Sequence, residues 1–128
     1  MRRLVISYGP ADRRAFGDVR AWAAEGLLGM AITVRDEPEA LGDADDAVAR
    51  CRLRASIEAA TALVVLVGDA TRGHPWVDYQ LALAVEAQRD LLAVRVPGTR
   101  GPAPAAIQHL PLLPFEPRAI RQQLAALW

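Results

Sequence analysis

Polar side chains follow three apolar segments of this chain, at the points where strands of a sheet are expected to end. The first segment is followed by hydroxyl groups and a carboxylate, the second by an Arg-Asp pair and the third by a threonine. The residues concerned are Ser7, Tyr8, Gly9, Asp12, Arg35, Asp36 and Thr71. In an open parallel sheet, ligands bind beyond the carboxyl ends of the strands, where the strand order reverses. The sequence therefore predicts a ligand-binding crevice lined by these residues.

The helix expected after the third segment adds an indole and an amide near its start, at Trp76 and Gln80. A tryptophan on an apolar helix is more often part of the core than a ligand contact, and both roles stay open for Trp76. The amide of Gln80 can hydrogen-bond a hydroxyl group but carries no charge. Arg35 and Asp36 could equally be an ordinary ion pair at a strand end, which contributes little by itself.

Five apolar segments are expected to form the strands that position these side chains. They are residues 3–8, 30–35, 62–67, 91–96 and 110–115, and the helical patterns are 11–25, 45–60, 76–88 and 116–127. The run ALVVLV at 62–67 lacks alternation, which is typical of a central parallel strand covered on both faces. Strands that alternate with helices predict right-handed crossovers. We therefore expect an α/β fold, a flavodoxin-like three-layer sandwich with a doubly wound, mainly parallel sheet of about five strands.

Length and composition limit the function classes. The chain has 128 residues, 52% of them hydrophobic, which predicts a single domain over residues 1–128. Fifteen basic residues balance fifteen acidic ones, so no nucleic acid partner is expected. All of the basic residues are arginine, which excludes a Schiff-base lysine and the lysine of phosphoacceptor receiver domains. No apolar stretch is long enough to cross a bilayer, so we expect a cytoplasmic protein without a membrane partner.

The cysteine and the two histidines give little reason to expect redox or metal chemistry. Cys51 cannot form an intramolecular disulfide, and it shares a helical stripe with Val48 and Ala55. This pattern predicts a packed structural thiol. His74 and His109 lack companion ligands at metal-binding spacing, so we expect surface or capping roles for them and no metal site.

Three segments carry a family resemblance. The run VISYGPAD is similar to the opening box of TIR domains, in which a strand ending in Ser-Tyr precedes an acidic residue. The run RDEP followed by Gly42 resembles their second box, with a longer loop than usual. The most specific match, VVLVGDATRGHPWVDYQ, resembles the TIR-like ThsB proteins of the bacterial Thoeris anti-phage system. The likeness covers most of the chain up to Val96, and the remainder matches only in element order.

The resemblance implies NAD as the ligand and gives Gln80 a special meaning. In that family, a glutamate four residues after the helix tryptophan cleaves the bond between nicotinamide and ribose, and here Gln80 stands four residues after Trp76. The reaction calls for a negative charge beside a ribose that becomes oxocarbenium-like, or for a carboxylate that holds the ribose hydroxyls. Gln80 cannot supply that charge, and neither Asp78 nor Glu86 is a convincing substitute. We therefore expect the chain to bind better than it turns over, whether the glutamine is engineered or natural.

Two functions remain open after this comparison of motifs. With a glutamate at position 80, the domain would convert NAD into an ADP-ribose-type signal that a separate effector senses. Alternatively, it is a degenerate TIR module that acts in self-association or binds nucleotides without catalysis, which the glutamine favours. TIR domains often need assembly to complete their pocket, so the resemblance also implies a homo-oligomer as a partner.

Overall fold

The computed structural model describes residues 2–29, 32–35 and 47–127, and its strands form one parallel sheet. The strands are β1 (Arg2–Ser7), β2 (Ile32–Arg35), β3 (Ala62–Val67), β4 (Asp90–Arg95) and β5 (Leu112–Leu113). Their order in the sheet is β2-β1-β3-β4-β5. This order and the parallel pairing confirm the predicted flavodoxin-like, doubly wound sheet.

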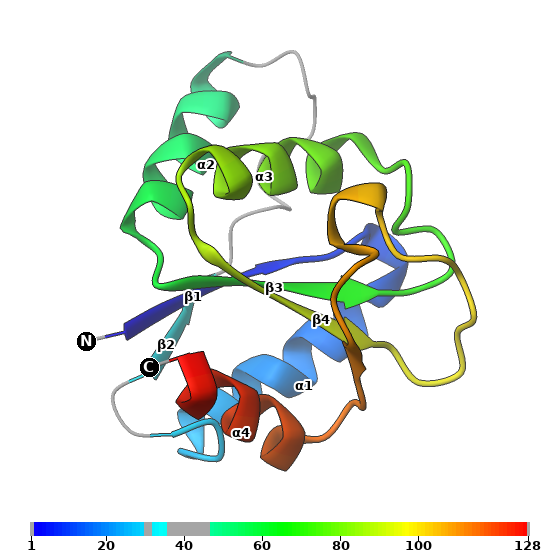
Figure 1. Ribbon diagram of the computed structural model, residues 1–128. Coiled ribbons are helices and arrows are strands. Elements are labelled where there is room, and N and C mark those ends of the chain that lie inside the picture. Colours follow the sequence, from blue (N-terminus) through cyan, green and yellow to red (C-terminus); the bar gives the residue numbers. More distant parts are fainter. Residues whose placement is uncertain (1, 30–31, 36–46, 128) are drawn as a thin grey trace.

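Helices cover both faces of the sheet and make the outer two layers of the sandwich (Figure 1). They are α1 (Arg13–Ala24), α2 (Ala47–Ala59), α3 (Pro75–Glu86) and α4 (Pro117–Leu127). Helices α2 and α3 lie on one face, and α1 and α4 lie on the other. Two short 3₁₀ helices stand in the loops after β1 and β4, namely η1 (Pro10–Asp12) and η3 (Ala105–Ile107).

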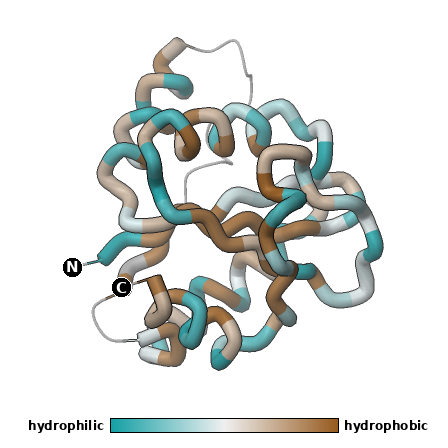
Figure 2. Tube along the Cα trace, in the orientation of Figure 1, coloured by the Kyte–Doolittle hydropathy of each residue, from teal (hydrophilic) through white to brown (hydrophobic). Residues whose placement is uncertain are grey.

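The core lies on both sides of β3, all of whose residues are buried, as the unbroken apolar run predicts. Alternate residues point to opposite faces because the side-chain period of a strand is two. Val65 and Val67 pack with α2 and α3, whereas Val64 and Leu66 pack with α1 and α4. Figure 2 shows the hydrophobic residues concentrated along the central strands and the hydrophilic ones on the outer sides of the helices.

All strands end at the same edge of the sheet, because every pairing is parallel. The loops that follow β1, β3 and β4 therefore meet at this carboxyl edge. Each helix returns the chain to the opposite, amino edge, where β1 begins and α4 ends (Figure 1). Within the described ranges, none of the helices is long and apolar enough to cross a membrane.

Element boundaries differ from expectation where prolines intervene. Helix α1 begins at Arg13 rather than at residue 11, because the chain from Pro10 first makes a 3₁₀ turn. Strand β5 shrinks to Leu112–Leu113, and prolines 111 and 114 flank it. Proline has no N–H to donate to a sheet, so it confines the strand to two residues.

The predicted packing of Cys51 is wrong, since its thiol is exposed and free. Helix α2 buries the face that carries Leu53 and Ile57, and this turns the stripe with Val48 and Ala55 toward the outside. Val48 is 62% exposed. Leucine and isoleucine remove more apolar area from water than alanine or cysteine, so they decide which face of the helix is buried.

Candidate functional site

Gln80 of α3 and Ser7 of β1 meet at the carboxyl edge, as expected if the end of β1 and α3 border a crevice. Ser7 lies two residues after Val5 in the strand, so its side chain points to the same face of the sheet, the one that α2 and α3 cover. The Ser7 hydroxyl donates a hydrogen bond of 2.5 Å to Gln80 Oε1. Both side chains are at least 99% buried.

The nitrogen of the Gln80 amide makes no hydrogen bond to the described residues. Among the residues that the structure describes, none accepts a hydrogen bond from Nε2, although this nitrogen is buried. A buried polar atom without a partner costs about 1–3 kcal/mol, and native proteins keep few of them. Gln80 is therefore anchored through its oxygen, and its buried Nε2 has no partner among the described residues.

Tyr8 lies on the opposite face from Gln80. It is 3% exposed and stacks on Phe16 of α1, with ring centroids 4.7 Å apart and an interplanar angle of 12°. The alternation of β1 accounts for this placement, since residue 8 must point away from the side to which residue 7 points. The structure thus separates Ser7 and Tyr8, two neighbours that the sequence analysis placed in one crevice.

Asp12 and Thr71 join the loop after β1 to the loop after β3. The Thr71 hydroxyl accepts a 2.7 Å hydrogen bond from Gly68 N and lies 3.4 Å from Asp12 Oδ2, to which it donates. The carboxyl group of Asp12 rests on Gly68, where an added Cβ would come within 2.4 Å of it. Burial raises the pKa of Asp12, the Thr71 hydrogen bond lowers it, and the nearby charge of Asp69 raises it further. Both predicted residues therefore make contacts within the chain that join the two loops.

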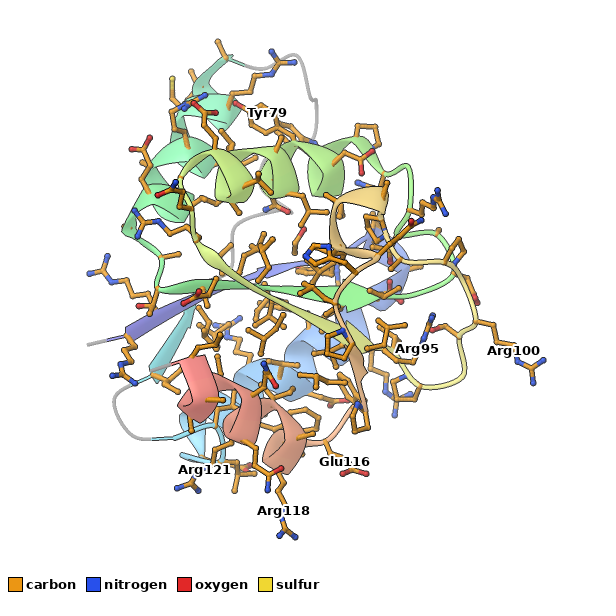
Figure 3. The ribbon with its side chains drawn as sticks, in the orientation of Figure 1. Tyr79, Arg95, Arg100, Glu116, Arg118 and Arg121 are labelled. Carbon is orange, nitrogen blue, oxygen red and sulfur yellow. The ribbon has the colours of Figure 1, made fainter. Side chains whose placement is uncertain are left out.

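A second connection joins the loop after β3 to the loop after β4, and the sequence analysis did not foresee it. Asp69 Oδ1 accepts hydrogen bonds from Arg100 N at 2.8 Å and from Gly101 N at 2.9 Å. Arg95 Nη1 donates to Gly101 O at 2.8 Å. Figure 3 shows Arg95 among these loops, whereas Arg100 projects outward. The only sequence signal is an Asp after β3 together with a Gly after β4, 32 residues apart.

Trp76 belongs to the core between α3 and the sheet. It is 8% exposed and makes an edge-on contact with Tyr79, with centroids 5.9 Å apart. Tyr79 in turn lies under the guanidinium of Arg50 from α2, at 5.5 Å. This placement agrees with the structural role that remained open for Trp76 in the sequence.

Gly9 lies beside the ring of His74, the residue that precedes α3. A Cβ built on Gly9 would stand 3.8 Å from His74 Cδ2, which is ordinary van der Waals contact. The His74 ring is half-buried, and no side-chain hydrogen bond to the helix start is made from it. His109 is exposed in the segment before β5.

The second predicted box can be placed only in part. Arg35 is the last residue of β2 and stands opposite Val5 in the register of the sheet. Asp36 lies outside the described residues. Within the described ranges, no group of three His, Cys, Asp or Glu side chains could hold a metal ion.

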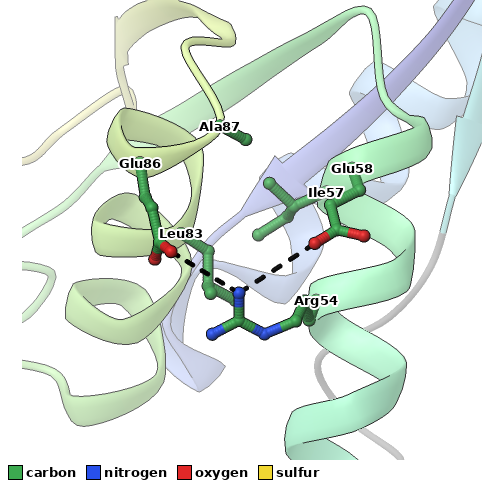
Figure 4. Close-up of a pocket in the computed structure, with 6 residues that line it drawn as sticks. All are labelled: Arg54, Ile57, Glu58, Leu83, Glu86 and Ala87. Atoms are coloured by element: carbon green, nitrogen blue, oxygen red, sulfur yellow. Dashed lines mark ion pairs between the residues drawn. The ribbon is translucent and has the colours of Figure 1, made fainter.

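A shallow pocket of about 170 Å³ lies between α2 and α3 at the amino edge, away from Gln80 (Figure 4). Arg54 stands between two glutamates there, 4.0 Å from Glu58 and 3.8 Å from Glu86. All three side chains are about half exposed or more, so solvent screens these ion pairs. Glu86 is thus engaged at the far end of α3 and does not stand in for a carboxylate at position 80.

Comparison with solved structures supports the fold. The TIR domain of the Toll-related receptor TRR-2 from Hydra magnipapillata superposes with a TM-score of 0.67 at 14% identity, covering 97% of this chain and 96% of that one. A 2-desoxiribosyltransferase from Leishmania mexicana gives a TM-score of 0.54 at 18% identity, covering 74% of this chain. The chain spans 65% of the length of that transferase. Identities this low establish a shared fold and nothing about chemistry.

Sequence comparison identifies the family. No curated protein matches the chain significantly. The family model of the TIR-like domain of Thoeris protein ThsB matches residues 6–101, which include the end of β1, all of β3 and α3, and the Ser7–Gln80 contact. This match covers well over half of the chain, so the protein belongs to the family of ThsB TIR-like domains.

Proposed function

We propose that this chain is an NAD-binding TIR-like domain of bacterial anti-phage signalling, in which Gln80 replaces the catalytic glutamate and suppresses NAD cleavage. The observation that carries the proposal is the contact between Ser7 Oγ and Gln80 Oε1 at the carboxyl edge of the sheet. It puts residue 80 beside the end of β1, where ligands of open parallel sheets bind.

A glutamate in place of Gln80 would keep the contact with Ser7. Ser7 already donates to one side-chain oxygen, and a second oxygen in place of Nε2 would break no hydrogen bond within the described residues. A carboxylate there would supply the negative charge that an oxocarbenium-like ribose needs. The amide has nearly the shape of the glutamate without its charge, so its presence removes turnover and leaves the other contacts with the ligand in place.

The experiment compares the parent protein with Gln80→Glu at high protein concentration, by NAD consumption and product identification by mass spectrometry. We expect nicotinamide release from Gln80→Glu at a rate about 10²-fold or more above the parent. The matched control is Gln122→Glu, which adds the same charge on the exposed side of α4 and should leave the parent's rate unchanged.

Binding of NAD by the parent, measured by calorimetry, keeps the proposal testable even if a buried glutamate unfolds the variant. Nicotinamide release from Gln80→Glu alone would support an NAD-processing domain inactivated at its catalytic position. Binding without release by either protein would favour the second candidate, a degenerate TIR module that binds nucleotides or self-associates. Neither binding nor release, even in an assembled state verified by sedimentation, would exclude NAD as the ligand.

A further inference from the structure

The side chain of residue 80 is enclosed, although the proposed function places it next to the ligand. Gln80 is 1% exposed and Ser7 is 0% exposed. Residues close to them in the sequence, namely Val5, Val77 and Leu81, belong to the hydrophobic cluster between the sheet and helices α2 and α3. A ligand at the carboxyl edge therefore cannot touch residue 80 while its side chain keeps this position.

One hydrogen bond holds the Gln80 amide in this enclosed position. Ser7 Oγ donates to Gln80 Oε1 at 2.5 Å, and this contact joins β1 to α3 across 73 positions of the sequence. Gln80 Nε2 has no partner among the residues that the structure describes. The carbonyl end of the amide is thus satisfied in the enclosed position, and the nitrogen end is not.

The unsatisfied nitrogen makes the enclosed position less favourable than a fully satisfied one would be. If the side chain turned outward, Nε2 would donate to water, so the enclosed position lacks hydrogen bonds that an open position has. Gln80 is unbranched and lies in the second turn of α3, and other rotamers can point its amide elsewhere without a change in the helix backbone. Among the described residues, Ser7 is the polar group that opposes this movement.

We propose that the Ser7–Gln80 hydrogen bond is an autoinhibitory latch, which encloses residue 80 in the free protein and breaks when NAD binds. The inference rests on the proposed function. The apparent affinity of such a protein is its intrinsic affinity multiplied by the fraction of molecules in the open state. A hydrogen bond that exists only in the closed state lowers this fraction. Removal of the Ser7 hydroxyl should therefore strengthen NAD binding, whereas it would weaken binding if Ser7 held residue 80 in place for the ligand.

The chain has two serines, and the second one supplies a matched control. Ser7→Ala removes the latch, and Ser56→Ala makes the same change at the other serine, which is buried on α2. In calorimetry, Ser7→Ala should bind NAD about 2- to 10-fold more tightly than the parent, the factor that corresponds to one hydrogen bond of ordinary strength. Ser56→Ala should bind NAD as the parent does. Circular dichroism of both variants verifies that they are folded.

A measurement on the parent protein serves if Ser7→Ala does not fold. We would record the side-chain amide signals of the glutamines by ¹⁵N NMR while adding NAD. The Nε2 signals of Gln80 should move, because the side chain leaves its enclosed position. Those of Gln122, which is exposed on α4, should stay in place.

The possible outcomes separate the latch from the proposed function. Equal or weaker NAD binding by folded Ser7→Ala, or Gln80 signals that stay in place at saturating NAD, would overturn the latch and leave the proposed function standing. An equal gain of affinity in Ser56→Ala would also overturn the latch, because the gain would then be independent of residue 80. Failure of both the parent and Ser7→Ala to bind NAD would remove the proposed function and this inference together.

Discussion

Replacing Gly101 by alanine should destabilise the protein, because the loop after β4 touches the loop after β3 through backbone atoms. A Cβ on Gly101 would lie 2.5 Å from Gly68 O, 2.6 Å from Asp69 Cα and 2.8 Å from Asp69 O. Backbone atoms cannot rotate away as the end of a side chain can. To reach ordinary contact near 3.4 Å, the two loops must separate by about 0.9 Å.

This separation determines the size of the effect. Overpacking of a filled site costs about 1–3 kcal/mol. The same movement lengthens two hydrogen bonds of Gly101, one to Asp69 Oδ1 at 2.9 Å and one from Arg95 Nη1 at 2.8 Å. Each involves a charged group and is partly open to solvent, so their partial loss adds about 1 kcal/mol. We expect Gly101→Ala to lower the free energy of unfolding by about 2–4 kcal/mol.

The assay is urea unfolding followed by far-ultraviolet circular dichroism, comparing midpoints at an unchanged slope. Gly17→Ala is the matched control, because Gly17 lies in α1 and an added Cβ meets nothing within 4 Å. Alanine in a helix should raise stability by about 0.5–1 kcal/mol there. A loss below about 1 kcal/mol in Gly101→Ala, in the range of an ordinary surface substitution, would refute the close contact between the two loops.

Three further predictions follow from single residues. Burial raises the pKa of Asp12 above its ordinary value of 3.8, so the folded state binds the proton more tightly than the unfolded state. The contribution of Asp12 to the free energy of unfolding should therefore fall as pH rises from 3.8 to neutral. Over that range Asp12→Asn should become more stable relative to the parent, as measured by urea unfolding at a series of pH values. A difference in stability between the two proteins that does not change with pH would contradict this. Gln88 has a φ of 57° just after α3, so Gln88→Gly should raise the thermal midpoint through about 0.5–1 kcal/mol of relieved strain, and an unchanged or lower midpoint would argue against that strain. The exposed thiol of Cys51 should react stoichiometrically with a maleimide in the native protein, and a requirement for denaturant would show that it is covered.

Much of the fold could be predicted because its signals are local and strong. The unbroken apolar run of β3 gives both its boundaries and its central place, and the alternation of strands with helices gives the parallel order. The buried face of α2 could not be chosen in the same way. One helical stripe of its sequence carries small residues around Cys51, and another carries Leu53 and Ile57. Only the larger side chains of the second stripe show which of the two is buried.

The site was partly predictable for a similar reason. The end of β1 and the start of α3 were expected to meet, and the Ser7–Gln80 hydrogen bond is consistent with that expectation. Tyr8 and Ser7 point to opposite faces because the side-chain period of a strand is two, so this separation could have been predicted from the sequence. The contact of Asp69 with Gly101 was not, because it joins two irregular loops whose shapes no pattern of hydrophobic residues specifies.

The shared edge at which β1 begins and α4 ends has a practical consequence for attaching the molecule to something else. A surface, a fluorescent protein or a second domain joined to either end would approach from the side of the Arg54 pocket. Ser7, His74 and Gln80 would face away from the point of attachment. Capture through a tag at either end should therefore leave the nucleotide experiments described above undisturbed, and immobilised and free protein should give the same affinities.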